Sequence, residues 1–281
     1  MKKTKTIGIL ALGLFSTASA LQAATIYGLT ATNGLVQFDS ATPGVVLPIG
    51  TISQPGIVDI DFFPVNNLLY GITSTGDTYS ISLLTAGATF LFSPLTALSN
   101  LTDLDFNPVA DRMRIFGNTD ANYRMVPDAT TAPSAPGTAG TVLLDGTFSN
   151  TAFQLVSSAY TNNADGAATT TLYSIDAVTD SLIIHSVAPQ FNTVTAVGGG
   201  LGTAVGVNVG FDVDPSGTAY LSDDNNFYTV NLGSGVATSA GTVGLVGDSL
   251  VSIAAVVPEP TSALLGLSGL GLLVARRRRS A

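Results

Sequence analysis

The chain has 281 residues, of which 10% are charged, and it contains neither cysteine nor tryptophan. The missing cysteine excludes disulfides, a thiol nucleophile and a cysteine-ligated metal. Seven of the ten basic residues lie at the two ends, so the region between them carries 18 Asp against three Arg, a net charge of about −15. Such a surface repels nucleic acid and anionic membranes, and we expect no nucleic-acid partner.

The N-terminus has the three parts of a secretory signal. Lys2, Lys3 and Lys5 precede an apolar segment at 7–15, and small residues at 18–20 and at 23 suit a signal peptidase. The apolar segment is too short to span a membrane. We therefore predict that residues 1–23 are a signal peptide and that residues 24–256 form the exported body.

Short strand-like segments recur along the body. The first kind reads YGLT and YGIT in its clearest copies, and its five copies lie at 27–30, 70–73, 115–118, 159–162 and 219–222. A second strand follows most of them closely, at 36–39, 79–82, 123–126, 173–176 and 228–231. A third kind, DIDFFP in its clearest copy, is expected at 59–64, 103–108, 153–157, 211–215 and 249–255. The first two copies of this third kind begin 44 residues apart.

Repeats of this length, built from short antiparallel strands, are typical of β-propellers. We therefore predict an all-β, β-propeller-like body of about five blades, each with four short antiparallel strands. The opening strand at 26–30 has no strand before it to pair with, and the closing strand at 250–256 has none after it. We expect these two strands to pair and close the ring, because closure removes two free sheet edges.

Aspartates alternate with apolar residues in the third kind of segment, as Asp59 and Asp61 and again as Asp103 and Asp105. Paired carboxylates suit calcium binding or acid–base chemistry. Because the pattern repeats from copy to copy, it favours a structural interpretation. In that interpretation the carboxylates accept backbone N–H groups and fix a turn.

Two other groups are candidate ligand sites. Asp223 and Asp224 begin an oxygen-rich loop and are the calcium candidates, although the loop lacks EF-hand spacing and suits a solvated hairpin turn. Arg112, Arg114 and Arg124 are the only cations of the body, and their pattern favours ion pairing with the nearby Asp111, Asp120 and Asp128. The functional alternative for these arginines is contact with an anion or a sugar acid.

No nucleophile elbow, phosphate loop or multi-histidine metal motif is present in the sequence. We therefore predict no catalytic residues, no assigned metal site and no cofactor apart from the calcium alternative.

The C-terminal segment, residues 257–281, again has three parts. Pro258, Glu259 and Pro260 precede an uncharged stretch at 261–275, and a basic cluster follows, formed by Arg276, Arg277, Arg278 and Arg279. As a helix the uncharged stretch is about 22 Å long, short of the roughly 30 Å hydrocarbon core of a membrane. We expect this hydrophobic helix to insert only transiently into the inner membrane, with its arginines on the cytoplasmic side.

This tail resembles the PEP-CTERM sorting signal, in which Pro-Glu-Pro is the recognition motif and an exosortase removes the tail. The resemblance implies an exported protein of a Gram-negative, exopolysaccharide-producing bacterium. The LYGIT-like and DxDFxP-like segments, over roughly residues 26–256, resemble the family named domain of unknown function 4394. That family implies no assigned activity.

Together these features predict a precursor tethered to the inner membrane that becomes a protein of the cell surface or extracellular matrix. Its processing partners would be signal peptidase and an exosortase. The body is expected to be a non-enzymatic binding or structural module, with exopolysaccharide, matrix proteins or calcium as candidate partners. The alternative is a secreted hydrolase or lyase with an acidic site in the funnel of the propeller.

Overall fold

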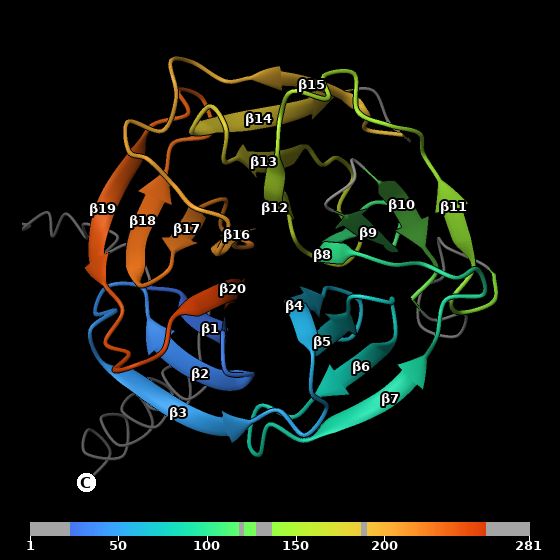
Figure 1. Cartoon of the computed structure of the whole chain (residues 1–281), viewed down its shortest axis with the longest axis horizontal. Coiled ribbons are helices and arrows are strands. Elements are labelled where there is room, and N and C mark those ends of the chain that lie inside the picture. Colours follow the sequence, from blue (N-terminus) through green and yellow to red (C-terminus); the bar gives the residue numbers. More distant parts are fainter. Residues whose placement is uncertain (1–22, 118–120, 128–136, 187–189, 257–281) are drawn as a thin grey trace, which may run out of the picture.

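The computed structural model describes residues 23–117, 121–127, 137–186 and 190–256. In these residues all regular structure is β, and 20 strands form five four-stranded antiparallel sheets. The sheets surround a central axis as the blades of a propeller (Figure 1), which confirms the predicted fold class. The same residues contain no helix that is both long and apolar enough to cross a membrane.

Each blade runs from an inner strand at the axis to an outer strand at the rim. Blade 1 consists of β20 (Leu250–Val256), β1 (Thr25–Thr30), β2 (Gly34–Asp39) and β3 (Val46–Thr51). Blade 2 consists of β4 (Ile57–Phe63), β5 (Leu68–Thr73), β6 (Thr78–Ile81) and β7 (Ala88–Phe92). Blade 3 consists of β8 (Leu101–Asn107), β9 (Arg112–Gly117), β10 (Asn122–Met125) and β11 (Val142–Leu144).

Two further blades complete the circle. Blade 4 consists of β12 (Leu155–Tyr160), β13 (Leu172–Asp176), β14 (Ser181–Ser186) and β15 (Thr193–Ala196). Blade 5 consists of β16 (Val209–Val213), β17 (Ala219–Asp223), β18 (Asn226–Val230) and β19 (Ala237–Thr242).

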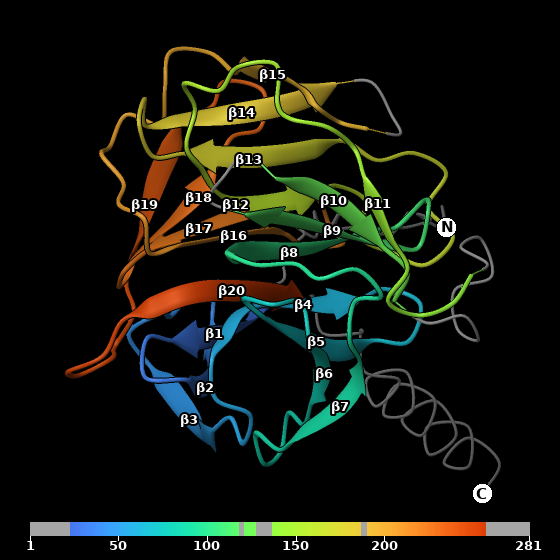
Figure 2. The same cartoon turned by 45° about the vertical axis from the view of Figure 1, so that its right-hand side comes forward.

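The N-terminal strand and the C-terminal strand of the body close the ring. β1 pairs with β20 in antiparallel register, with Thr25 opposite Val256 and Gly28 opposite Ile253. Figure 2 shows β20 running alongside β1. The predicted closure is therefore confirmed, and blade 1 is built from both ends of the body.

The core lies between neighbouring blades rather than inside any one of them. Between blades 2 and 3, Phe63 stacks on Phe106 with ring centroids 4.6 Å apart, and Tyr70 meets Phe106 edge-on. An inner strand has a blade on each side, so β4 and β8 are buried at nearly every position. The outer strands are mostly exposed, as in β7 and β19. This gradient explains why aspartates in the inner strands end up deep inside the molecule.

Blade 4 differs from the predicted strand order. Residues 155–160 form a single inner strand, so the predicted segments at 153–157 and 159–162 both fall on β12. The predicted second strand at 173–176 belongs to β13, which pairs directly with β12. The cause is the long connection at 161–171, because it separates β12 from β13 by more residues than the turns of the other blades. The third strand of the blade is β14, which none of the three kinds of repeated segment covers.

Candidate functional site

Side chains of the inner strands link each blade to the next around the axis. Asp61 Oδ2 accepts the backbone N–H of Phe106 at 3.1 Å, and Asp105 Oδ1 accepts that of Tyr160 at 3.2 Å. The other links of this kind join Asp59 to Leu104, Asp103 to Ser158, Ser157 to Phe211, Asp212 to Ala255 and Ser252 to Ile60. The aspartates thus accept backbone N–H groups as expected, but mainly from a neighbouring blade and not from a local turn.

These links place equivalent residues of the five inner strands in two rings. Ring 1 contains Asp59, Asp103, Ser157, Gly210 and Ser252, and ring 2 contains Asp61, Asp105, Ala159, Asp212 and Ala254. In ring 2, carboxylate oxygens of the three aspartates lie within 4.8 Å of one another. Each of these aspartates is 2% exposed, so ring 2 concentrates three acidic groups in the buried centre of the molecule.

Burial raises the pKa of every ring aspartate, because a charged carboxylate loses its hydration there. It raises the pKa of Asp103 and that of Asp212 to about 7. The neighbouring charge of Asp212 raises the pKa of Asp61 further, and the charge of Asp61 does the same for Asp105. Ring 2 therefore favours protonated carboxyl groups near neutral pH.

Ring 2 has two ways to relieve its charge. Protons can neutralise it, which agrees with the raised pKa values. A hard cation is the other way, since carboxylate oxygens suit Ca²⁺, but Ca²⁺ takes roughly six to eight oxygen ligands. Ring 2 offers three carboxylates, and each already accepts a backbone N–H from the next blade. The donor set therefore fits protons better than calcium.

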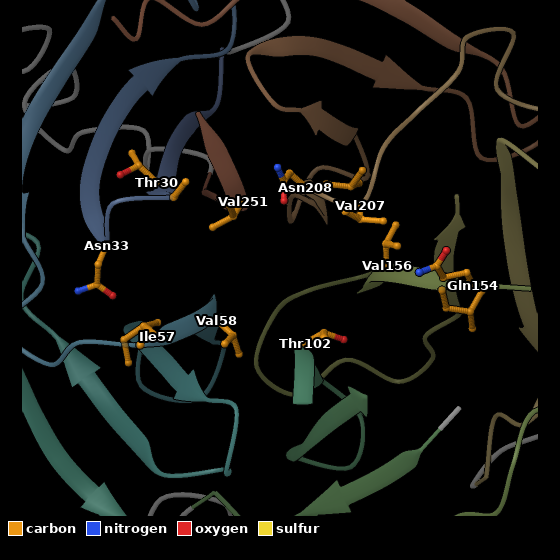
Figure 3. Close-up of a pocket in the computed structure, with 14 residues that line it drawn as sticks. Thr30, Asn33, Ile57, Val58, Thr102, Gln154, Val156, Val207, Asn208 and Val251 are labelled. Carbon is orange, nitrogen blue, oxygen red and sulfur yellow. The ribbon is translucent and has the colours of Figure 1, made fainter. Parts of the chain in front are cut away.

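A cavity of about 600 Å³ opens at the end of the axis where the inner strands begin. Its floor consists of one residue from each inner strand, namely Val58, Thr102, Val156, Val209 and Val251. Figure 3 shows four of these around the centre of the opening. Each floor residue directly precedes a ring 1 residue, so this valine-rich layer lies between the cavity and the aspartates. None of the ring aspartates lines the cavity.

The wall of this cavity, which we call the axial funnel, is mainly aliphatic and carries a few polar, uncharged side chains. Thr30, Asn33, Gln154 and Asn208 contribute hydroxyl and amide groups (Figure 3). Asn33 Nδ2 donates to the carbonyls of Ile52 and Gln54, whereas its buried Oδ1 has no hydrogen-bond partner within the described residues. An unsatisfied buried acceptor is costly, so a donor on a ligand would be favoured there.

The three body arginines lie together on blade 3. Arg114 is 1% exposed and donates to Asp145 at 2.6 Å, and Arg124 binds the same carboxylate through two nitrogens at 2.6 and 2.8 Å. Asp145 was not among the aspartates expected to pair with these arginines. It directly follows β11, about twenty residues after Arg124, and only the pairing of β11 with β10 brings it near. Asp120 and Asp128 lie outside the described residues.

The calcium candidates Asp223 and Asp224 lie at the hairpin turn between β17 and β18. Asp223 Oδ1 accepts the N–H of Gly206 at 2.8 Å, and Asp224 Oδ1 accepts from the amide of Asn208 at 3.1 Å. Asp224 has a left-handed φ of 49°, as residues in tight hairpin turns do. The two carboxylates therefore hold the loop that enters β16, on the outer side of the funnel.

The two ends fall outside the described residues. These include residues 1–22 of the predicted signal peptide, the sorting motif Pro258, Glu259 and Pro260, and the cluster Arg276, Arg277, Arg278 and Arg279. For the tail, the comparison with known families supplies the finding. Residues 256–279 match the PEP-CTERM protein-sorting motif. The motif implies an exported protein that an exosortase processes at the membrane and that ends up at the cell surface.

Solved structures with a similar fold are distant in sequence. A protein of unknown function from Bacteroides thetaiotaomicron is 13% identical, with a TM-score of 0.47, and the match covers 83% of this chain but 62% of that one. The periplasmic gluconolactonase of Pseudomonas aeruginosa is also 13% identical, with a TM-score of 0.43 and coverage of 80% and 69%. A chain of a nidogen/laminin complex is 10% identical, with a TM-score of 0.47 and coverage of 83% and 98%.

No curated protein matches the sequence. A family match, by contrast, covers the propeller from residue 21 to residue 254, all but the last two residues of β20, and so includes both rings and the axial funnel. On that match, the chain belongs to the family described as domain of unknown function, DUF4394.

Proposed function

We propose that this protein is a non-enzymatic binding protein of the cell surface or extracellular matrix, and that its propeller holds an uncharged ligand in the axial funnel. The observation that carries this proposal is the funnel itself, a cavity of about 600 Å³ to which all five blades contribute. A concave site of this size, with apolar walls and a few convergent polar groups, is typical of ligand binding.

The chemistry of the funnel favours binding over hydrolysis. General acid–base catalysis needs an ionisable group within hydrogen-bond reach of the substrate. The described residues that line the funnel carry only aliphatic, hydroxyl and amide side chains. The ring aspartates have shifted pKa values, but they lie beneath the valine-rich floor and bind backbone N–H groups. This arrangement argues against the alternative of an acidic hydrolase or lyase site in the funnel.

The ligand would be a neutral exopolysaccharide segment. Its hydroxyl groups can donate to Asn33 Oδ1 and exchange hydrogen bonds with Gln154 and Thr30, while its C–H faces pack on valines. Polyanions are disfavoured, because the body carries 18 Asp. Calcium at Asp223 and Asp224 would have a supporting role, because these residues hold the loop beside Asn208.

The route to the surface is part of the proposal. Signal peptidase would remove residues 1–23, and the helix within residues 257–281 would rest briefly in the inner membrane until an exosortase cuts the tail. Processing would also remove seven of the ten basic residues. The protein released to the surface would therefore be strongly acidic and soluble in its own right.

A blocked-funnel variant tests the proposal. Thr102→Trp places a large ring at an exposed position of the funnel floor, and Thr96→Trp places the same ring at an exposed position outside it. Binding to neutral polysaccharides would be measured by affinity electrophoresis, with and without calcium. We expect Thr102→Trp to abolish retardation and Thr96→Trp to leave it unchanged. Equal retardation of both variants, or none with the unsubstituted protein, would refute the funnel as the site.

A further inference from the structure

A second cavity lies between blades 3 and 4, away from the axial funnel. It has a volume of about 300 Å³ and is lined by Asn107, Val109, Ala110, Arg124, Thr169, Thr170 and Phe191. These residues come from β8 and its turn into β9, from β10, from the connection at 161–171 and from the segment before β15. Figure 1 shows blades 3 and 4 as neighbours in the ring. We call this space the interblade cavity.

Arg112 belongs to the same face of blade 3 as the cavity lining. It lies opposite Asn107 in the β8–β9 pair, and Arg114 lies opposite Arg124 in the β9–β10 pair. Because alternate residues of a strand share a face, all three guanidinium groups leave the sheet on the side of blade 4. The sequence thus places every cation of the body on one face of one blade.

The guanidinium of Arg112 is incompletely satisfied. Its Nη1 is buried and has no hydrogen-bond partner in the described residues, whereas Arg124 and Arg114 both bind Asp145. Burial lowers the pKa of Arg112, and the charge of Arg124 lowers it further, while Asp111 acts in the opposite direction. A buried N–H of a cation without an acceptor is costly, and an anionic acceptor relieves that cost most effectively.

The charges around the cavity also leave a positive excess. Three arginines face the carboxylates of Asp145 and Asp111, while burial raises the pKa of Asp105, opposite Arg114, and so favours its neutral form; the overall charge of the body is about −15. The surrounding negative field repels polyanions, but a small ligand with one carboxylate meets mainly the local field. The other lining groups suit the rest of such a ligand, because Thr169 and Thr170 offer hydroxyls and Phe191 offers a ring face.

We propose that the interblade cavity binds a small hydroxylated carboxylate, such as a single uronic acid. Its carboxylate accepts hydrogen bonds from Arg112 and Arg124, its hydroxyls contact the two threonines, and its ring packs on Phe191. Two contacts fix the position of Phe191. Its carbonyl accepts a hydrogen bond from Nδ1 of His185 at 2.7 Å, and its ring centroid lies 5.5 Å from Cζ of the Arg114 guanidinium. This site is separate from the axial funnel and does not depend on the function proposed for it.

The test uses the full chain purified in mild detergent, with glucuronate as the probe and glucose as its uncharged counterpart. Isothermal titration should show glucuronate binding that weakens with added salt, and no glucose binding. Arg112→Gln should lower the affinity about tenfold to a hundredfold, since a charge-assisted hydrogen bond is lost. Arg112→Lys keeps the positive charge but loses the planar guanidinium with its paired N–H donors, so it should retain part of the affinity for glucuronate.

Two control variants separate this site from the rest of the molecule. Gln154→Ala in the funnel should leave the affinity for glucuronate unchanged. Ala110→Leu fills the interblade cavity while all three arginines stay in place, and it should abolish binding. Far-ultraviolet circular dichroism checks that each variant is folded. The proposal is overturned if glucuronate does not bind, if glucose binds equally well, or if folded Arg112→Gln and Ala110→Leu both bind as tightly as the original protein.

Discussion

Replacing Asp212 by Asn should make the propeller more stable above pH 7 and less stable at pH 4. Burial raises the pKa of this carboxyl group to about 7, from an ordinary value of 3.8. The raised value means that its stabilising contribution is complete below pH 3.8 and is lost as the pH rises through the folded-state pKa. One pKa unit corresponds to about 1.4 kcal/mol, so ionisation costs about 4 kcal/mol of folding free energy by pH 8.

The hydrogen bonds of Asp212 reduce the expected gain. Its two oxygens accept the N–H groups of Val213 and Ala255, both at 2.6 Å, whereas a carboxamide has one oxygen. The lost acceptor costs about 1–2 kcal/mol. The NH₂ group of the new side chain would face Asp61 and Asp105 and donate to them. The net expectation is a gain of about 2 kcal/mol at pH 8 and a loss of about 1–2 kcal/mol at pH 4.

Urea unfolding at pH 4, 6 and 8 measures this crossover, because the free energy of unfolding extrapolates linearly from denaturant. Asp165→Asn makes the same chemical change on an exposed side chain and should shift all three values alike. The reasoning fails if Asp212→Asn changes stability by the same amount at pH 4 and pH 8. That result would mean that the carboxyl group of Asp212 is not held protonated in the folded state.

Three further predictions concern other parts of the molecule. Burial lowers the pKa of His185 to about 4, so the stability contributed by its neutral form is complete above pH 6.5 and falls by about 2 kcal/mol by pH 5. Urea unfolding should show this loss in the original protein and not in His185→Gln. Gly210→Ala should lower the melting temperature, because the new Cβ would lie 2.5 Å from the backbone nitrogen of Ile253, whereas Gly199→Ala meets nothing and should not. Asp145→Asn should cost about 3–5 kcal/mol in urea unfolding by leaving the paired guanidinium groups without their counter-ion.

The strand order could be predicted from the sequence in the blades where the repeated segments keep their spacing. In blades 2 and 3 the DxDF segments lie 44 residues apart, and both form inner strands that pair with the next strand of their own blade, β4 with β5 and β8 with β9. Blade 4 was predicted poorly, because residues 161–171 lengthen one connection and displace the matches within that blade, whereas the matches in blade 5 fall on the expected strands. Loop length is weakly constrained by folding energetics, so spacing alone cannot identify a strand after a long insertion.

The candidate site was only partly predictable. Aspartates that alternate with apolar residues indicated carboxylates that accept backbone N–H groups, but which blade supplies the N–H depends on tertiary packing. The funnel floor could not be recognised, because Val58 and Thr102 look like ordinary strand residues until five strands converge. Likewise Asp145 could be assigned to Arg114 and Arg124 only once β11 had returned alongside β10.

The departures from repeat symmetry follow from the electrostatics of a closed ring. In a perfect propeller each repeated aspartate would lie at the same distance from the axis, and ten carboxylates would meet in two rings. Ser157 and Ser252 make the same link to the next blade without a charge, at 3.0 and 3.2 Å. An aspartate can satisfy two donors, as Asp61 does with the N–H groups of Phe62 and Phe106, and its cost grows with each neighbouring carboxylate. Mixing aspartate with serine, glycine and alanine keeps most links while limiting the charge, and the valine-rich floor above them separates the remaining carboxyl groups from the axial funnel.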